Sequence, residues 1–202
     1  ASQYFSVGEE KTITLTTGEE VTLQILGFNH DDLADGSGKA GITFGMKNLL
    51  ATKYSMNSEG TNVGGWDSSV MRTSTMATLL SQLPADLRAA IKTVSKKATA
   101  GNKSTTITTS TDSLFLFSEV ELDGTTSAGY KDEGVQYDYW KSHNTANDRI
   151  KKLSNGGGSA YFWWLRSPGT SGTTAFRYIA SGGGVYSGSA SGSYGVCFGF
   201  CI

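Results

Sequence analysis

The chain opens with two short runs in which apolar and polar residues alternate. These runs, Thr12 to Thr16 and Val21 to Leu26, flank a turn that contains glycine. Alternation with a period of two is typical of a strand with one buried face, so the pair predicts a β-hairpin. A further apolar run follows after a loop in GITFGMKNLL, residues 41–50.

The middle of the chain has helical spacing. An amphipathic helix is predicted from Ser68 onward, with Ser68 or Ser69 as its N-cap. Pro84 ends this helix and can occupy the first position of the next, so PADLRAAIKTVSKK, residues 84–97, predicts a second helix. The expected apolar faces are Val70, Met71, Leu79, Leu80 and Leu83 in the first helix and Leu87, Ile91 and Val94 in the second.

The second half of the chain returns to strands. A Thr-rich run at 104–112 and a strongly apolar run, Leu114 to Phe117, predict two strands, the second of them buried. One helical turn is expected near Asn147 to Leu153. Three more β-like runs lie at 161–167, 175–180 and 194–202. Helices bracketed by strands in this way predict an α+β domain with antiparallel sheets.

Composition adds limits to this picture. The chain has 202 residues, of which 38% are hydrophobic and 17% charged, and its 26 glycines accompany only 2 prolines, as in a turn-rich globular protein. The net charge of −1 gives no support to binding of nucleic acid. No window approaches the ~18 apolar residues of a membrane span, and no signal-peptide pattern opens the chain, so we expect no membrane insertion. Because no linker divides it, we interpret residues 1–202 as a single domain.

The least ordinary stretch is GTSGTTAFRYIASGGGVYSGSASGS, residues 169–193. Such a Gly/Ser-rich composition also suits a flexible tether. However, AFRYI lies inside the stretch and a β-like run follows it, which favours a segment pinned at both ends. All 12 lysines, 8 glutamates, 4 glutamines, 4 methionines and 4 tryptophans lie in residues 1–168, and none lies in 169–202.

Signatures of enzymatic chemistry are missing from the sequence. It contains no Ser nucleophile elbow, no phosphate-binding GxxxxGK[ST] and no HExxH. His30 and His143 lack a second ligand at metal spacing; HDD at 30–32 could contribute to a cation site, with a solvated loop as the alternative. The aspartates are scattered along the sequence, and no two of them suggest a pair for general acid–base catalysis. We therefore expect no enzymatic activity, no catalytic residues, no metal and no cofactor.

Two cysteines lie close to the C-terminus, Cys197 and Cys201. In a strand they would share a face at a separation of about 13 Å, taking ~3.3 Å per residue. A disulfide needs Cα atoms within about 7 Å. We expect both to be free, buried thiols.

Aromatic and arginine residues recur in two motifs, GGWDSSVMR at 64–72 and FWWLRSP at 162–168. Adjacent tryptophans in a strand point to opposite faces, so one can fill the core while the other packs under loops. The arginines are expected to bind buried carbonyls or carboxylates such as Asp67 or Glu119. The structural residues predicted in this way are Trp66, Arg72, Trp163, Trp164 and Arg166.

These motifs carry a resemblance to a known family. GGWDSSVMR, the LP before a helix, TDSLFLFSEVE, WWLRSP and the closing GVCFGFC together resemble the variable proteins of diversity-generating retroelements, which are bacterial and phage domains with the C-type lectin fold. The resemblance runs from about residue 12 to the end of the chain. It implies a compact α+β domain with a hairpin joining the termini, two helices, and a second, twisted sheet that supports a loop-rich ligand-binding face.

The resemblance also implies a source of variation. In that family, reverse transcription misincorporates at template adenines, so chosen codons near the 3′ end of the gene become random. An Asn codon randomised at its first two positions cannot yield Lys, Glu, Gln, Met or Trp. The absence of these five residue types after residue 168 is the result that such a mechanism would leave.

By this resemblance, the protein is a ligand-binding display protein, a receptor-binding or tail-associated component on a phage virion or a bacterial cell surface. Its ligand would be a cell-surface protein or glycan, and it would form a homo-oligomer or attach to a larger virion protein. The EPN and WND motifs of calcium-dependent lectins are absent, so calcium-dependent sugar binding is not implied.

Two alternatives stay open at this point. One is a structural domain of a bacterial envelope or phage protein without a diversified site. The other is a cysteine oxidase of the formylglycine-generating type, whose surrounding active-site pattern is missing here. Under the first interpretation, the variable region is 169–193, and the candidate ligand-binding residues are Thr170, Thr173, Phe176, Arg177, Tyr178, Val185, Tyr186, Ser187, Ser189, Ser191, Ser193 and Tyr194.

Overall fold

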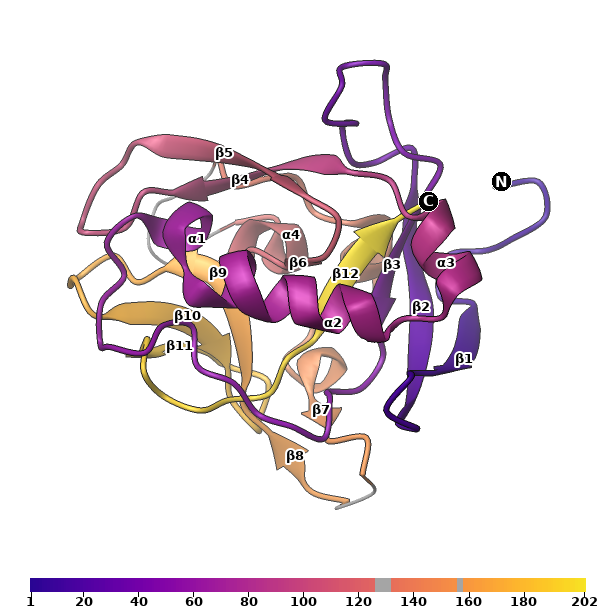
Figure 1. Ribbon diagram of the computed structural model, residues 1–202. Helices are drawn as coiled ribbons and strands as arrows, with labels where there is room; N and C mark the ends of the chain where they lie inside the picture. Colours follow the sequence, from indigo (N-terminus) through magenta and orange to yellow (C-terminus); the bar gives the residue numbers. More distant parts are fainter. Residues whose placement is uncertain (126–131, 156–157) are drawn as a thin grey trace.

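The computed structural model describes residues 1–125, 132–155 and 158–202, and its largest sheet contains both ends of the chain (Figure 1). Its five strands lie in the order β1-β2-β3-β12-β6, and every neighbouring pair is antiparallel. The predicted N-terminal hairpin is confirmed, and the C-terminal strand lies between β3 and β6. The strands are β1 (Glu10–Thr14), β2 (Glu20–Phe28), β3 (Ile42–Met46), β6 (Phe115–Leu116) and β12 (Phe198–Cys201).

A second sheet has three antiparallel strands in the order β11-β10-β9 and lies apart from the first, at the lower left of Figure 1. It is formed by β9 (Trp163–Pro168), β10 (Ala175–Ile179) and β11 (Val185–Ser189). Two small antiparallel pairs complete the β-structure: β4 (Val94–Thr99) with β5 (Ile107–Asp112), and β7 (Lys151–Lys152) with β8 (Ala160–Tyr161).

The helices are short and more numerous than the two expected. The first predicted helix begins after Ser69, whose hydroxyl accepts the backbone N–H of Arg72 at 3.2 Å, which is the hydrogen bond of an N-cap. The helical elements are α1 (Gly65–Ser68), a π-helical turn (Met71–Thr75), α2 (Met76–Gln82), α3 (Ala85–Ala90), α4 (Glu119–Asp123), α5 (Asp138–Ser142) and a 3-10 turn (Asn147–Arg149).

Two details of the helix prediction are wrong. The second helix ends at Ala90, and Val94 begins β4 instead of extending a helical face. Pairing with β5 over the whole of β4 buries Val94, Lys96 and Ala98, which alternate with a period of two. In the first helix, Val70 is 43% exposed, because the buried face consists of Met71, Met76, Leu79 and Leu83.

The core lies between the two large sheets and contains the tryptophans of the quoted motifs. Trp66, Trp163 and Trp164 are fully buried, together with phenylalanines of β6 and β12. Gly45 and Gly199 face each other across β3 and β12, and a Cβ at either would lie within 3 Å of the Phe117 ring. The predicted α+β class with antiparallel sheets is confirmed. Within the described residues no helix has the length and apolarity needed to cross a membrane.

We predict that Gly65→Ala strongly destabilises the fold. Gly65 has φ +57°, and an added Cβ would lie 2.0 Å from the Thr99 carbonyl oxygen. The strain and the backbone clash should lower the free energy of unfolding by about 3 kcal/mol, measured by urea denaturation. Gly172→Ala is the control, since its Cβ would meet nothing within 4 Å. Equal effects of the two substitutions would contradict the prediction.

Candidate functional site

The 169–193 stretch is an ordered hairpin with its flanking loops, as the sequence predicted for a segment pinned at both ends. β10 and β11 pair in a regular register that sets Arg177 opposite Ser187 and Tyr178 opposite Tyr186. On its other side β10 pairs with β9, where Trp164 lies opposite Tyr178. β10 thus attaches the stretch to the tryptophan strand.

Asn62 fixes the loop that leads into this hairpin. It is fully buried, and its Nδ2 lies 3.2, 3.3 and 2.8 Å from the carbonyl oxygens of Gly169, Gly172 and Ala175. Its backbone N–H donates to the Thr173 carbonyl, and its Oδ1 accepts the backbone N–H of Asn102. One amide side chain therefore anchors the loop 169–175 to the body of the protein. No local sequence pattern marks Asn62 for this role.

Further backbone contacts hold the far side of the hairpin. Tyr54 and Tyr194 exchange two backbone hydrogen bonds of 2.9 and 3.0 Å, and the Met56 N–H donates to the Ala190 carbonyl. The guanidinium of Arg149 donates to the carbonyl of Gly183 in the β10–β11 turn at 3.1 Å. Tyr54, Met56 and Arg149 lie far from the 169–193 stretch in sequence, and Tyr194 is the residue that follows it.

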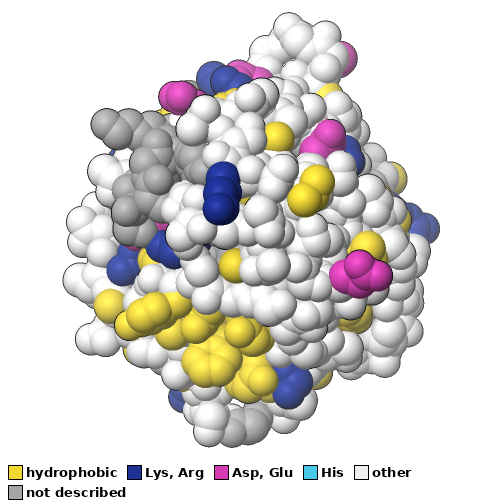
Figure 2. Space-filling view, turned by 90° about the vertical axis from the view of Figure 1, so that its left-hand side faces the viewer, with side chains coloured by type: hydrophobic (Ala, Val, Ile, Leu, Met, Phe, Trp, Pro, Cys, Tyr) yellow, Lys and Arg dark blue, Asp and Glu magenta, His cyan; other side chains and the backbone are white. Residues whose placement is uncertain are grey.

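An aromatic cluster forms the centre of this surface. The ring of buried Trp164 stacks on Tyr194 at 4.3 Å between centroids, Tyr194 contacts Tyr178 at 4.8 Å, and Tyr178 contacts Tyr186 at 6.1 Å. Phe162 lies 5.7 Å from both Tyr178 and Tyr194. The rings step outward from the core to Tyr186, which is 57% exposed. Figure 2 shows hydrophobic side chains gathered on this side of the molecule, over the β9–β11 sheet.

The glycines of this stretch make room for these rings. A Cβ at Gly188 would lie 2.7 Å from the Tyr194 hydroxyl oxygen and 3.1 Å from the Tyr178 ring. A Cβ at Gly184 would lie 2.9 Å from the Tyr186 ring. The glycine content therefore has a packing reason in addition to its turns.

The predicted surface residues separate by exposure. One group is exposed: Thr173, Tyr186, Ser187, Ser189, Ser191 and Ser193. A second group is partly buried: Thr170, Arg177, Tyr178, Val185 and Tyr194. Phe176 corrects the expectation of outward side chains, because it is fully buried and belongs to the hydrophobic core.

The partners of the arginines differ in part from those predicted. Arg177 donates from Nε and Nη2 to the Glu119 carboxylate at 2.9 and 3.3 Å, so it holds β10 against α4. Glu119 was an expected partner of Arg72 or Arg166. Arg72 pairs with Asp67 at 3.4 Å, as expected, and also with Asp112 at 2.6 Å.

Each of the predicted structural tryptophans donates its indole N–H to an acceptor inside the protein. Trp66 donates to Asp112 at 2.9 Å, Trp163 to the Arg149 carbonyl at 3.0 Å, and Trp164 to the Tyr54 carbonyl at 2.8 Å. Both residues of the Trp163–Trp164 pair are fully buried, one on each face of β9.

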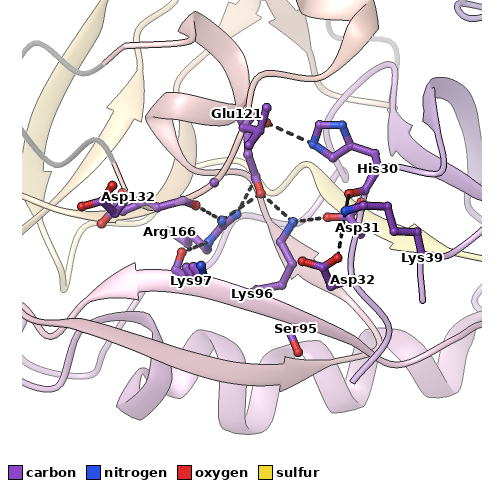
Figure 3. A pocket seen from close by; sticks show the side chains of 13 residues that line it. His30, Asp31, Asp32, Lys39, Ser95, Lys96, Lys97, Glu121, Asp132 and Arg166 are labelled. Carbon is purple, nitrogen blue, oxygen red and sulfur yellow. Dashed lines mark hydrogen bonds and ion pairs between the residues drawn. The ribbon is translucent and has the colours of Figure 1, made fainter. Parts of the chain in front are cut away.

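A second polar site lies away from this surface, around a pocket of about 310 Å³ whose lining includes Asp31, Lys96, Glu121 and Arg166 (Figure 3). The Lys96 ammonium lies 2.7 Å from Asp31 Oδ1 and 2.5 Å from Glu121 Oε1. Arg166 binds both oxygens of Glu121, at 2.5 and 2.8 Å. The solvated-loop alternative for HDD at 30–32 therefore holds for Asp32, which is exposed, and fails for Asp31, which is 5% exposed and paired with Lys96.

Opposing effects set the pKa values of this cluster. Burial alone would lower the pKa of Lys96, but the carboxylates of Asp31 and Glu121 raise it above its ordinary value. Burial would raise the pKa of Glu121, but Arg166 and Lys96 hold it below its ordinary value. The opposite charges of these groups therefore compensate one another within a buried cluster.

Glu133 lies beside this cluster in a different environment. Its carboxylate accepts the Thr99 N–H at 2.8 Å and the hydroxyls of Thr99 and Ser167. Burial raises the pKa of Glu133 in spite of these donors. A carboxyl group with an ordinary pKa is fully ionised near neutral pH. Burial shifts Glu133 toward its neutral form.

Metal and thiol chemistry find no support in the part of the chain that the structure describes. It contains no group of three or more His, Cys, Asp or Glu side chains placed to hold a metal ion. Cys197 and Cys201 are free and buried, as predicted. Burial raises the pKa of both thiols, which disfavours the reactive thiolate that a cysteine oxidase needs.

Fold and site together define an α+β domain with an anchored, aromatic-centred surface. Residues 40–202 match the family described as Domain of unknown function (DUF6273), so the chain belongs to that family. Neither the curated proteins nor the solved structures contain a match.

We predict that Asn62→Ala releases the loop 169–175. The substitution leaves buried carbonyls without a donor, which should lower the free energy of unfolding by about 3 kcal/mol. Amide hydrogen exchange, followed by mass spectrometry, should accelerate in 169–175 more than in the five-stranded sheet. Asn144→Ala, at an exposed position, is the control. Unchanged exchange in the loop would show that Asn62 does not anchor it.

We predict that Glu133→Gln flattens the dependence of stability on pH. A carboxyl whose folded pKa is raised contributes stability below its ordinary pKa of 4.5, and this contribution is lost as the pH rises through the raised value. As the pH rises from about 4.5 through the raised pKa, the wild type should therefore lose more stability than the variant, measured by urea denaturation. Glu20→Gln, at an exposed site, should follow the wild type.

Proposed function

We propose that this protein is a ligand-binding display protein with the C-type lectin fold, and that a diversity-generating retroelement varies its 169–193 surface. The sequence motifs and the missing residue types after position 168 support this proposal. The α+β architecture, with its N-terminal hairpin and C-terminal strand in one sheet, is compatible with that fold.

The observation that carries the proposal is the separation of backbone support from exposed side chains. The backbone of 169–193 is held by Asn62, Met56 and Arg149, none of which belongs to the stretch, and Tyr54 holds the residue that follows it. The exposed residues within it, Ser187 and Ser189 among them, lie outside the hydrophobic core. Such side chains can change while the scaffold keeps its shape.

The surface has the chemistry of a recognition site. Tyr186 and its partly buried neighbours Tyr178 and Tyr194 offer contact area at low cost in conformational entropy, and the surrounding Ser and Gly residues adapt to different partners, as in antibody loops. Tyrosines are frequent among the residues that dominate binding energy. The partner would be a cell-surface protein or glycan, met from a phage tail or a bacterial cell surface.

A structural domain without a diversified site is the second candidate. Tyrosine rings lie so close to Gly184 and Gly188 that a larger residue would not fit at either position. This packing accounts for part of the glycine content of 169–193 without any diversification.

The DNA around the gene distinguishes these two functions. Diversification requires a nearby repeat of the gene's 3′ end that differs at adenines, together with a reverse transcriptase gene. Among related isolates, substitutions should concentrate at the exposed positions of 169–193 and spare Asn62, Gly188 and Phe176. Substitutions spread evenly along the chain, or no adenine-biased repeat, would refute the proposal and favour the structural domain.

A further inference from the structure

Lys96 is held in contact with a carboxyl group inside the protein. Its side chain is 2% exposed, and its Nζ lies 2.7 Å from Asp31 Oδ1 and 2.5 Å from Glu121 Oε1. The Phe115 ring lies 4.1 Å from Nζ, and Tyr137 donates to both oxygens of Asp31 at 3.1 Å. Figure 3 shows Lys96 between the two carboxylates. An amine and a carboxyl group are thus fixed together where bulk water is excluded.

The two carboxyl groups around Lys96 have different partners. Glu121 is bound at both oxygens by Arg166, which keeps it a carboxylate and so a proton acceptor. Asp31 instead receives hydroxyl donors, Thr43 at 2.6 Å on Oδ2 and Tyr137 on both oxygens. Hydroxyl donors aimed at a carboxyl oxygen stabilise negative charge that develops there during addition to its carbon. These environments mark Asp31 as the electrophile and Glu121 as the base.

We propose that Lys96 and Asp31 join in an intramolecular isopeptide bond, formed by the folded chain with Glu121 as the catalytic residue. One proton passes from the Lys96 ammonium to the Asp31 carboxylate, which gives a neutral amine and a neutral acid. The amine attacks Cγ, and Glu121 takes a second proton from Nζ and delivers it to the departing hydroxyl. A C–N bond forms, a C–O bond breaks, and one water leaves. The opposite charges cancel, and no oxidant or other reactant is needed.

Burial and positioning favour this condensation. In water the ion pair is the stable state, but removing both charges from water penalises it relative to the neutral amide. The fold also holds the reacting groups together, which replaces the entropy cost of a bimolecular encounter. The pocket of about 310 Å³ is lined by Asp31, Lys96 and Glu121, so the released water has a place to go.

The bond would link the segment after β2 to β4 across 65 positions of sequence. It would thereby tie the five-stranded sheet to the β4–β5 pair. A cross-link of this span restricts the unfolded chain, as a disulfide does.

The test is the intact mass of the purified full chain under denaturing conditions. We expect a mass lower than that of the sequence by one water molecule. Trypsin should then release a branched peptide that joins residues 12–39 to residues 93–97, because the modified Lys96 is not cleaved. A full mass, with separate peptides ending at Lys39 and Lys96, would overturn the proposal without reference to any variant.

Variants assign the roles of the three side chains. Lys96→Met should restore the full mass. Glu121→Gln removes the base but keeps a side-chain oxygen that can accept from Arg166, and the fraction of this variant that is folded by circular dichroism should have the full mass. Asp31→Asn should lose one ammonia in place of water, since an amide leaves as ammonia. Lys97→Met, at an exposed position on the same strand, is the matched control and should keep the mass deficit. A deficit that persists in Lys96→Met would place the bond elsewhere and overturn the assignment.

Discussion

The buried ion pair of Arg166 with Glu121 is the interaction on which the rest of the structure depends. Arg166 is fully buried and uses all of its guanidinium N–H groups. They bind the two Glu121 oxygens and the carbonyls of Lys97, Leu116 and Glu133. A buried charge without such partners costs several kcal/mol, so β9 has one permitted position relative to α4, β4 and β6. This constraint connects the two large sheets.

The position of β9 in turn determines the position of the candidate surface. Arg166 lies two residues from Trp164, and Trp164 packs against Tyr194 and lies opposite Tyr178. The rings occupy space left open by Gly184 and Gly188, and Asn62 holds the loop 169–175 that leads into β10. The surface is therefore built on fixed supports, and the freedom to vary is confined to side chains that point away from them. The proposed binding function rests on this arrangement.

Local patterns predicted the parts of the fold that depend on local sequence. The N-terminal hairpin, the Ser69 cap, the strands around WWLRSP and the free cysteines all follow from alternation, capping chemistry or spacing. The end of the second helix could not be predicted locally. The residues after Ala90 have spacing that is compatible with a helix, and it is pairing with β5 that makes a strand from Val94 onward. Phe176 was misassigned because its place in the core depends on how β10 lies over residues distant in sequence.

The polar residues that organise the site were missed for a related reason. Asn62 meets its acceptors more than 100 positions away, and Asp31 meets Lys96 across 65. No local pattern distinguishes a buried aspartate in HDD from a solvated one. The arginines of the two quoted motifs were expected to bind carboxylates, and they do, but the specific partners depend on tertiary structure.

If a fixed scaffold carries side chains that are free to change, the fold should tolerate random substitution of the exposed surface. A library would vary the exposed positions Thr173, Tyr186, Ser187, Ser189, Ser191 and Ser193 together, and sorting for protease resistance would report folding. Most members of this library should fold like the parent, whereas a matched library at Asn62, Phe176, Gly188 and Tyr194 should be largely unfolded. Similar loss of folding in both libraries would contradict this expectation.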